Sequence, residues 1–453
     1  MAGELTLEEL SRHTGELEER LRHWRSLGLI GRDGEHDFAL KDAERVRLIQ
    51  LCLRRGITLQ AISDADKESD LLDRYLDLIF PEGATTAVTM AEAAEIVGLD
   101  LEMLGRVSAA AGFAEPVDFV RERDLEGLRL FKTLRDLGFP DEPLIQGTRV
   151  LADSLGRVAE MEARLFHIYV HQRLRAAGVS GQELIEATNR AGDQTMPLVE
   201  PMILYFHRLG WERALREDVV DHIAEEAGLL PPADQPGELT RAVAFVDLSS
   251  FTPLTAAMGD AAAAQVLERF SELVREQVNR WEGRVIKQIG DAFMAVFPDA
   301  RLAVACAVEI ESRTASEPQF PAVRSGIHWG TVLYREGDYV GSNVNIASRL
   351  ASEADRHQTL VTADVWKEAR DLPGIEFVRV GKRRLKGLTG QTELFEVRRS
   401  SAPGTDRTVD PVCGMELTVA EVAARLTLDA GEQAFCSDDC LRKFVAAPEA
   451  YAT

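Results

Sequence analysis

The chain of 453 residues has 45% hydrophobic and 28% charged side chains, a composition typical of a globular protein with several domains. Its 52 basic and 75 acidic residues give a net charge of −23, which excludes a general nucleic-acid binder and a protein that coats an anionic membrane. No apolar run reaches the roughly 18 residues of a membrane span. Acidic residues stand where a signal peptide needs a basic stretch, so we expect a cytoplasmic protein.

The N-terminal part, to about residue 229, has a helical pattern with few strand signals, as in the amphipathic stretches 45–53 and 151–174. Sequence blocks also repeat within it. The block that begins at Thr6 matches one that begins at Thr89, and the block at Asp42 matches one at Asp124. These offsets of 83 and 82 residues predict one helical unit that occurs twice.

Residues 5–63 resemble a MerR-like winged helix-turn-helix, and its recognition helix would carry Arg20, Arg22 and Arg25 around Trp24. Residues 1–63 nevertheless contain 10 basic and 11 acidic side chains, a poor footprint for phosphate contacts. The second copy has Met103, Gly105 and Ser108 at the positions that match the three arginines. We therefore expect such a unit over 1–75 and a helical regulatory domain with a degenerate copy over 76–229. DNA binding by the first copy stays an open alternative.

Two histidines stand out in this helical part. His167 and His171 are four residues apart and therefore share one face of the helix predicted over 151–174. Two adjacent imidazoles repel each other once both are protonated, near pH 6–7, so the pair is a candidate regulatory element. The alternative is two polar positions on a helix surface.

The pattern changes after residues 230–240, a proline-rich stretch that predicts a linker. We expect a buried strand over 241–246 and a helix over 261–278. Strands over 284–289 and 292–297 would follow, joined as a hairpin by Gly290 and Asp291. The order β-α-β-β predicts a second domain, of the α+β class, over 241–398.

Polar residues follow these strands. Asp247 comes at the end of the first strand and Asp291 on the hairpin turn. If the two strands are neighbours, the carboxylates converge at one sheet edge, as a pair of Mg²⁺ ions needs. Simple structural roles are the alternative, because Asp247 could cap the next helix and Gly-Asp suits any turn.

Asn345 and Arg349 are four residues apart and share one helix face. Arginine suits the charge that develops on a phosphorus centre, and a neutral amide can orient the attacking hydroxyl. The alternative is an exposed polar helix face.

Three segments resemble the signature blocks of class III nucleotidyl cyclases in order and spacing: Phe245–Thr252, Lys287–Phe293 and Asp338–Arg349. The resemblance implies a ferredoxin-like βαββαβ fold with Asp247 and Asp291 as ligands of two Mg²⁺ or Mn²⁺ ions. Lys287 and Asp338 stand where adenylyl cyclases read adenine, whereas guanylyl cyclases typically have Glu and Cys there. Asn345 and Arg349 fall on the transition-state pair. Lys386 would add a phosphate contact, although a lysine before a glycine is usually a solvated turn.

The implied reaction is intramolecular, because the ribose 3′-hydroxyl of ATP attacks the α-phosphorus and pyrophosphate leaves. In this family one subunit supplies the metal ligands and the other the base-reading and transition-state residues, which implies a homodimer with two shared sites. Residues 42–225 are also similar to the helical regulatory domain of some actinobacterial soluble adenylyl cyclases, which restrains catalysis. The competing interpretation is a MerR-like transcriptional regulator, or a nucleotide-binding signalling protein, whose cyclase fold does not turn substrate over.

Residues 399–407 predict a second linker, before a small cysteine-containing domain over 408–453. Cys413, Cys436 and Cys440, spaced C-x22-C-x3-C, resemble a YHS/TRASH-type metal-binding domain. Three thiolates suit a soft metal such as Zn²⁺ or Cu⁺. No histidine follows His357, so a fourth ligand would be a carboxylate, water or another chain. The alternative is a small fold whose cysteines are reduced and empty. Because a linker separates this domain from the cyclase motifs, we expect it to serve a sensory or protein-contact role.

Overall fold

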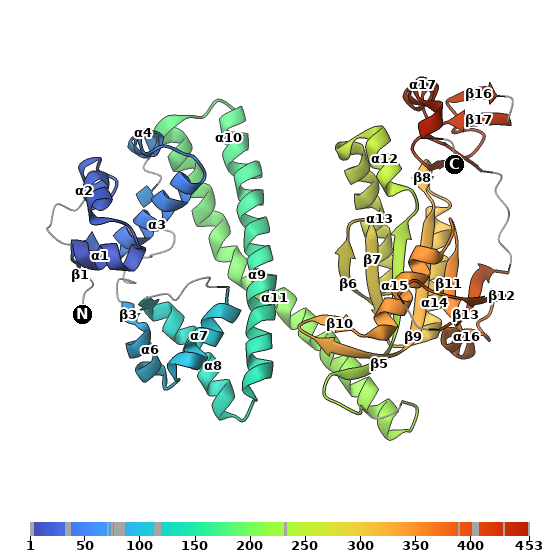
Figure 1. Ribbon diagram of the computed structural model, residues 1–453, viewed down its shortest axis with the longest axis horizontal. Helices are drawn as coiled ribbons and strands as arrows, with labels where there is room; N and C mark the ends of the chain where they lie inside the picture. Colours follow the sequence, from blue (N-terminus) through green and yellow to red (C-terminus); the bar gives the residue numbers. More distant parts are fainter. Residues whose placement is uncertain are drawn as a thin grey trace. The chain divides into compact units, whose positions relative to one another are not determined.

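The computed structural model describes residues 4–31, 38–69, 72–73, 76, 87–112, 119–230, 233–387, 390–400, 407–428 and 431–451. The chain forms two compact units, Met1–Val219 and Val220–Thr453, which can be followed by colour in Figure 1. Residues 231–232 and 401–406, which belong to the two predicted linkers, lie outside the described part of the chain. Within the described residues, no helix is both long and apolar enough to cross a membrane.

The first unit contains one order of elements twice. The first copy comprises β1 (Glu4–Leu5), α1 (Leu7–Thr14), α2 (Glu18–Ser26), β2 (Phe38–Ala39) and α3 (Leu40–Arg54), and α4 (Leu59–Ser69) follows it. The second comprises β3 (Ala87–Thr89), α6 (Met90–Val97), α7 (Leu101–Ala110), β4 (Phe119–Arg121) and α8 (Glu122–Asp136). In both copies the short strands pair antiparallel, and the first helix begins with a capping box, at Thr6 and at Thr89. The repeated order agrees with the repeated sequence blocks.

A long helix follows the second copy. It begins as α9 (Asp141–Phe166), continues as a π-helical segment, η1 (His167–Gln172), and ends as α10 (Arg173–Ala176). The sequence predicted this helix only from residue 151. The helix starts earlier because Pro140 precedes it and Asp141 and Glu142 place negative charge on its first turn, where the helix dipole favours it.

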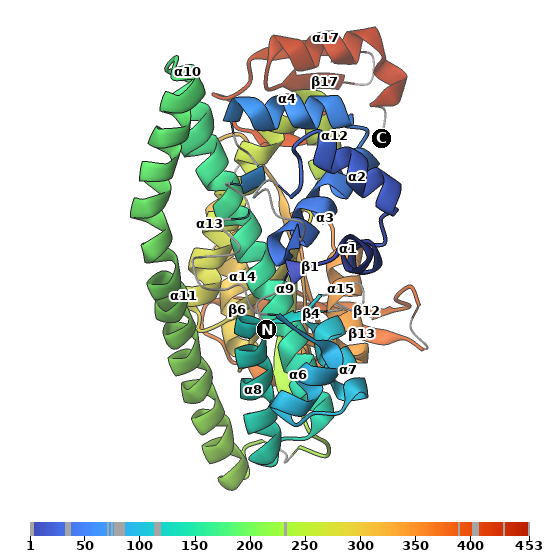
Figure 2. The same ribbon diagram turned by 90° about the vertical axis from the view of Figure 1, so that its left-hand side faces the viewer.

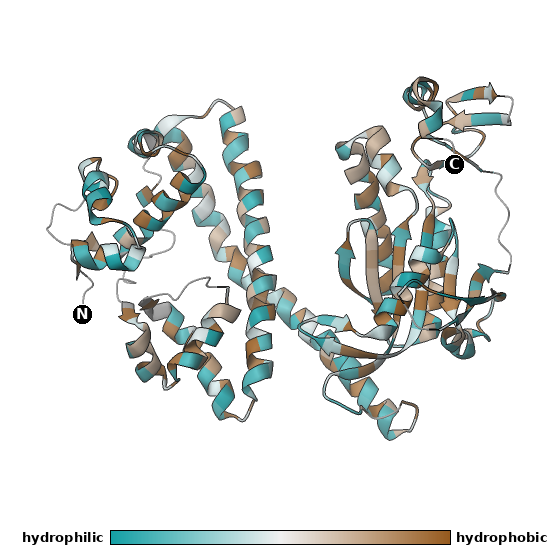
Figure 3. Ribbon diagram, in the orientation of Figure 1, coloured by the Kyte–Doolittle hydropathy of each residue, from teal (hydrophilic) through white to brown (hydrophobic). Residues whose placement is uncertain are grey.

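The next helix, α11 (Gly181–Glu226), is a single long rod in Figure 2. Apolar residues occur along it (brown in Figure 3), and many of their side chains are exposed in the single chain. Tyr205, Phe206 and Trp211 are exposed by 62%, 61% and 59%. So large an apolar surface on one helix is typical of a protein–protein contact.

The second unit is built on a mixed sheet with the strand order β12-β13-β11-β9-β5-β7-β6, and β10 pairs with β9. The strands are β5 (Glu238–Leu248), β6 (Arg284–Ile289), β7 (Ala292–Phe297), β9 (Val323–Arg335), β10 (Asp338–Val340), β11 (Thr359–Thr362), β12 (Ile375–Arg383) and β13 (Thr392–Arg399). The helices are α12 (Phe251–Met258), α13 (Asp260–Arg280), α14 (Ala300–Thr314), α15 (Ser342–Glu353) and α16 (Ala363–Ala369). The predicted strand and helix are confirmed with slightly wider bounds, and the hairpin is confirmed with the predicted bounds. Among the described strands of this sheet, β11 and β9 pair in parallel and the other pairs are antiparallel.

The residues of β5 alternate between the two faces of the sheet, as a strand buried on both sides requires. Ala242, Ala244 and Val246 pack with residues of α13 and α14, whereas Val243 and Phe245 pack with residues of α15. The helix α15 lies so close to β9 that a Cβ on Gly326 would meet backbone atoms of α15 at 2.1 and 2.6 Å. Glycine at this position therefore sets the place of α15 over the sheet.

The end of α11 belongs to the second unit, because Asp221 forms an ion pair with Arg241 of β5. Arg241 is only 5% exposed, so its charge needs this partner. The sequence placed the break in the chain at the proline-rich stretch after residue 229. The compact units divide earlier, inside the helix.

The tail of the second unit (residues 407–451) contains β14 (Thr408–Val409), β15 (Met415–Leu417), β16 (Ala424–Leu428), β17 (Gly431–Phe435), α17 (Asp438–Ala446) and the short 3₁₀ helix η2 (Pro448–Ala450). The predicted linker implied that the tail is separate from the sheet domain. The tail instead packs against that domain. The strand β15 pairs with β8 (Phe320–Pro321), just before β9, and tail residues share one apolar core with α12, α13 and the sheet. The tail docks because the burial of its apolar side chains is favourable, although residues 399–406, which connect it to the sheet domain, are small and polar.

Candidate active site

Two carboxylates meet at one end of the sheet. Asp247 is the penultimate residue of β5, and Asp291 follows Gly290 on the turn between β6 and β7. Because β5 and β7 are neighbours with Val246 opposite Phe293, the turn lies beside the end of β5. The carboxyl group of Asp247 lies close enough to Asp291 for its charge to act on the pKa of Asp291.

The charge of this pair shifts the pKa of Asp291. Its burial and the negative charge of Asp247 raise the pKa of Asp291 to about 6. Two carboxyl groups that are partly buried and repel each other form a donor set that fits a divalent cation.

The structure adds Arg324 to the site. This residue lies on β9 directly opposite Asp247, and its guanidinium donates two hydrogen bonds to Asp247 Oδ2, at 2.9 Å from Nε and 2.5 Å from Nη2. Asp247 therefore does not cap α12, whose N-cap residue is Ser250. Sequence reasoning missed Arg324. A charged residue at the start of a buried strand was the only available signal, and the pairing of β5 with β9 could not be known.

The residues predicted to read the base also lie together. Lys287 of β6 and Asp338 of β10 form an ion pair, with side chains exposed by 39% and 34%. Asp338 Oδ1 also accepts a hydrogen bond from the Tyr339 amide at 2.8 Å. A donor and an acceptor are thus presented side by side in a partly open position.

Asn345 and Arg349 both project from the exposed face of α15. Among the described residues, neither is hydrogen-bonded or ion-paired with Asp247, Asp291, Lys287 or Asp338. Lys386 is exposed on the turn after β12, next to the buried Leu385. Within one chain, the predicted residues therefore form separate groups, namely the two carboxylates, the ion pair that would read the base, the polar face of α15, and Lys386.

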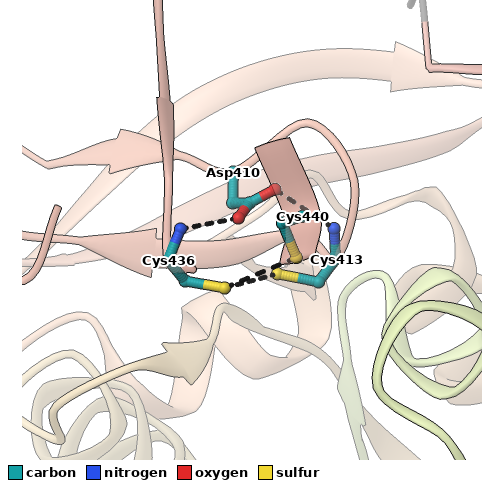
Figure 4. A group of neighbouring side chains, drawn as sticks. All are labelled: Asp410, Cys413, Cys436 and Cys440. Atoms are coloured by element: carbon teal, nitrogen blue, oxygen red, sulfur yellow. Dashed lines mark hydrogen bonds between the residues drawn. The ribbon is translucent and has the colours of Figure 1, made fainter. Parts of the chain in front are cut away.

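The tail brings its three cysteines together with one carboxylate (Figure 4). Sγ of Cys436 lies 3.5 Å from Sγ of Cys413 and 3.6 Å from Sγ of Cys440. The fourth residue is Asp410, which is fully buried and accepts hydrogen bonds from the amides of Val412 and Cys436, both at 2.8 Å. One potential metal-ligand atom from each of the four residues lies within 4.8 Å of the others.

Hydrogen bonds from the thiols of Cys413 and Cys436 lower the pKa of Cys440, whereas the pKa values of Cys413 and Cys436 are raised, so the cluster favours a single thiolate, at Cys440. Three sulfurs and a carboxylate at such distances fit the tetrahedral preference of Zn²⁺. The sequence left the fourth ligand open among a carboxylate, water and another chain. Asp410 was not singled out because it stands before a proline in what looked like an ordinary turn.

His357 joins the tail to the sheet domain. Its Nε2 lies 2.6 Å from Glu416 of β15 and its Nδ1 3.3 Å from Glu311 of α14, while Arg356 lies 3.4 Å from Glu416. The neighbouring carboxylates of Glu311 and Glu416 raise the pKa of His357 to about 9. Protonated His357 is thus an ionic link between two parts of this unit.

We expect His357→Gln to lower the free energy of unfolding at pH 6.5 by up to about 3 kcal/mol, since a pKa of about 9 in the folded state stands against about 6.5 in an unfolded chain. A raised histidine pKa stabilises the folded state fully below pH 6.5, and this contribution is lost as the pH rises through 9. The difference between variant and wild type should therefore shrink towards pH 10 in denaturant titrations. His207→Gln, in the other unit, is the control, and a pH-independent difference would contradict the prediction.

The histidines proposed as a switch, His167 and His171, lie on the π-helical segment η1. Their rings stack with centroids 5.4 Å apart and an angle of 18° between the planes. The predicted shared face is confirmed, although the helix is π and not α at this point. Such segments often occur at functional sites.

Comparison with known proteins identifies the family of both parts of the chain. Residues 238–398, which contain every candidate residue of the sheet domain, match the adenylate and guanylate cyclase catalytic domain, so the second unit is that of a nucleotidyl cyclase. Residues 33–211 match the adenylate cyclase regulatory domain. The chain belongs to the class III adenylate cyclases that carry this regulatory domain before the catalytic domain.

Several relatives are adenylate cyclases of actinobacteria. A pH-sensitive adenylate cyclase of Mycobacterium tuberculosis is 30% identical over 370 residues, which are 79% of this chain and 89% of the relative. An adenylate cyclase of Streptomyces coelicolor is 29% identical over 303 residues, 65% of this chain and 75% of the relative. The crystal structure of an adenylyl cyclase from P. aeruginosa matches 36% of this chain and 96% of its own, with 22% identity and a TM-score of 0.33.

Proposed function

We propose that this chain converts ATP into 3′,5′-cyclic AMP and pyrophosphate, with two Mg²⁺ or Mn²⁺ ions held by Asp247 and Asp291. The observation that carries the proposal is the meeting of these two carboxyl groups, because their repulsion fits the binding of divalent cations. Two relatives that align with this chain over most of their own length are named adenylate cyclases, which supports ATP as the substrate.

Bound Mg²⁺ or Mn²⁺ would lower the pKa of the ribose 3′-hydroxyl and balance charge on the phosphates. The chain itself would mainly position groups and stabilise charge. The first backbone amides of α12 are unpaired within the helix and would bind phosphate oxygens. Arg349 would stabilise charge at the α-phosphorus, Asn345 would orient the hydroxyl, and Lys386 would contact the polyphosphate.

Lys287 and Asp338 would recognise adenine. Adenine presents an amino donor beside a ring-nitrogen acceptor, and the adjacent carboxylate and ammonium groups match that pattern. The ion pair between them keeps the two groups in place before the base arrives.

A homodimer with two shared sites follows from the family. Asn345 and Arg349 are exposed and, among the described residues, form no hydrogen bond or ion pair with the carboxylates proposed to bind metal in their own chain, which supports their use by the partner chain. The exposed apolar side chains of α11 supply a surface on which two chains could associate.

The direct test is turnover. Purified protein with ATP and Mn²⁺ should release cyclic AMP and pyrophosphate in equal amounts. Release of ADP and phosphate would indicate a hydrolase, and a folded dimer that makes no product with either metal would overturn the proposal in favour of a nucleotide-binding signalling protein.

We also assign regulation to the N-terminal unit, since its match to the adenylate cyclase regulatory domain covers residues 33–211 and one relative is named pH-sensitive. The stacked His167 and His171 are the candidate sensors, because two protonated imidazoles at this separation would repel each other.

Removal of residues 1–219, which keeps Asp221 as the partner of Arg241, should change the cyclase rate at least about fivefold somewhere between pH 6 and 8, which is the lower end of typical allosteric couplings. In the full chain, His167→Gln with His171→Gln should flatten the pH profile of the rate. The exposed His222, also changed to glutamine, is the matched control. A truncated dimer with the rate and pH profile of the full chain would remove the case for control by this unit.

We infer that the first repeat is a MerR-like helix-turn-helix used for protein contacts and not for DNA. Arg20 and Arg22 form ion pairs with Glu16 and Glu18, at 2.9 and 2.6 Å, and Trp24 is fully buried. The positive charges of Arg20 and Arg22 are thus already balanced, and a DNA phosphate would have to displace Glu16 or Glu18 to contact them.

Two structural assignments complete the proposal. The order β9-β5-β7-β6, antiparallel throughout, is that of a ferredoxin-like βαββαβ core. The tail is a YHS/TRASH-type domain that binds one Zn²⁺ or Cu⁺ ion, and its three sulfurs around the buried Asp410 support this.

A further inference from the structure

The four metal-ligand candidates of the tail lie on segments that touch α12 at opposite ends. Asp410 and Cys413 belong to the turn 410–415, which is closed by hydrogen bonds from Gly414 N to Asp410 O and from Asp410 N to Met415 O, both at 2.9 Å. Cys440 lies on α17, and Cys436 stands between β17 and this helix. A metal ion bound to all four would join the turn rigidly to α17.

The turn contacts the start of α12. Gly414, with φ +74°, packs so closely on Ser250 that a Cβ at this glycine would lie 2.5 Å from Ser250 Cβ. Arg356 joins the same two residues, donating from Nη1 to Ser250 Oγ at 3.0 Å and from Nη2 to Gly414 O at 2.8 Å. The residue next to Cys413 is therefore linked directly to the N-cap of α12.

Helix α17 contacts the other end of α12. Lys443 donates a hydrogen bond to the carbonyl of Ala257, in the last turn of α12. Lys443 is one helical turn after Cys440, so a ligand that fixes Cys440 also fixes this contact. Leu254, in the middle of α12, lies in the same apolar core as Cys413, Cys440 and Phe444.

The start of α12 is a strained part of the proposed active site. Ser250 is a non-glycine residue with φ +68°, a left-handed conformation that costs about 1–2 kcal/mol. It stands three residues after Asp247, and its position directs the first amides of α12. Contacts that hold Ser250 thus hold the groups proposed to bind metal and phosphate.

We propose that a soft metal ion of the Zn²⁺ class, bound by Asp410, Cys413, Cys436 and Cys440, activates the cyclase by clamping α12 at both ends. Without the ion, the turn and α17 move independently, and the strained Ser250 relaxes. The inference rests on the proposed cyclase function for its kinetic consequence, but the clamping of α12 is measurable without turnover.

The test uses the full chain, freed of metal with a Zn²⁺-selective chelator and then reloaded with Zn²⁺, at saturating Mn²⁺ and ATP. One Zn²⁺ per chain should bind, and reloading should raise the cyclase rate at least about fivefold. Hydrogen exchange of the amides of residues 251–258 should slow on reloading. Cys436→Ser should abolish all three effects, whereas Cys52→Ser, in the other unit, should change none of them.

Arg356→Gln separates a clamp from a merely structural metal site. This variant should still bind one Zn²⁺, but its rate and its exchange at residues 251–258 should no longer respond to the ion. Zn²⁺ that binds and stabilises the fold without changing either readout would overturn the inference and leave the cyclase proposal intact. Absent turnover together with Zn²⁺-dependent protection of α12 would overturn the cyclase proposal alone. A chain that binds no Zn²⁺ would also overturn the inference.

Discussion

Replacement of Asp291 by asparagine should lower cyclase activity by on the order of 10³-fold, because the site then loses a negatively charged metal ligand while the shape of the side chain is kept. Arg349→Ala should cost a similar factor through the lost stabilisation of charge on phosphorus. Asp291 is partly buried on the hairpin turn and keeps its shape as asparagine, and Arg349 lies on the exposed face of α15, so neither change should unfold the protein. Circular dichroism and size-exclusion chromatography check the fold and the dimer.

Cyclase activity should return when the Asp291→Asn chain and the Arg349→Ala chain, each inactive alone, are produced together. A mixed dimer combines Asp291 of one chain with Arg349 of the other in one intact site, so random pairing should give about a quarter of the wild-type rate. Mixing two Asp291→Asn chains with different tags is the matched control and should give nothing. Failure of the mixed pair, with heterodimers demonstrated by tandem purification, would show that each site is built within one chain.

The second large effect concerns the choice of base. Lys287→Glu together with Asp338→Cys should move the ratio of kcat/KM for ATP over GTP by on the order of 10²-fold or more towards GTP, since unpaired polar groups then face adenine. The ion pair between these residues means that either single change leaves an unbalanced charge, so the double variant is the informative one. The exposed pair Arg379 and Glu393, which lies elsewhere on the sheet, provides a control double variant. Equal use of ATP and GTP by the wild type would contradict the assignment.

Local patterns predicted the parts of the fold that depend on neighbours in sequence. The turn Gly290-Asp291 lies between two apolar runs, and the hairpin forms there because glycine accepts φ +63°. Thr6 and Thr89 are each followed by glutamate three residues later, which fixed the starts of matching helices in both repeats. The convergence of Asp247 and Asp291 was predicted on the condition that their strands are neighbours, and the pairing of β5 with β7 meets that condition.

What could not be predicted depends on pairing between distant segments. Arg324 meets Asp247 only through the register of β5 on β9, 77 residues apart, and no local signal encodes that register. The docking of the tail rests on the short β8–β15 pair and on single contacts such as that of His357 with Glu416. The π-helical segment at His167 also escaped notice, because one extra residue in a turn leaves the apolar periodicity almost unchanged.

The close packing of the tail on β8 and α12 changes where the catalytic part of this enzyme can be cut. The family match ends at residue 398, which invites expression of a fragment that stops there. Phe320 and Leu254 are only 2% and 0% exposed, in an apolar core that they share with the tail. A fragment without residues 407–451 would present this surface to water, where exposed apolar area promotes aggregation. The smallest well-behaved catalytic piece therefore extends to the C-terminal helix, and a tail exchanged for that of a relative would need matching partners for Ser250, Arg356 and His357.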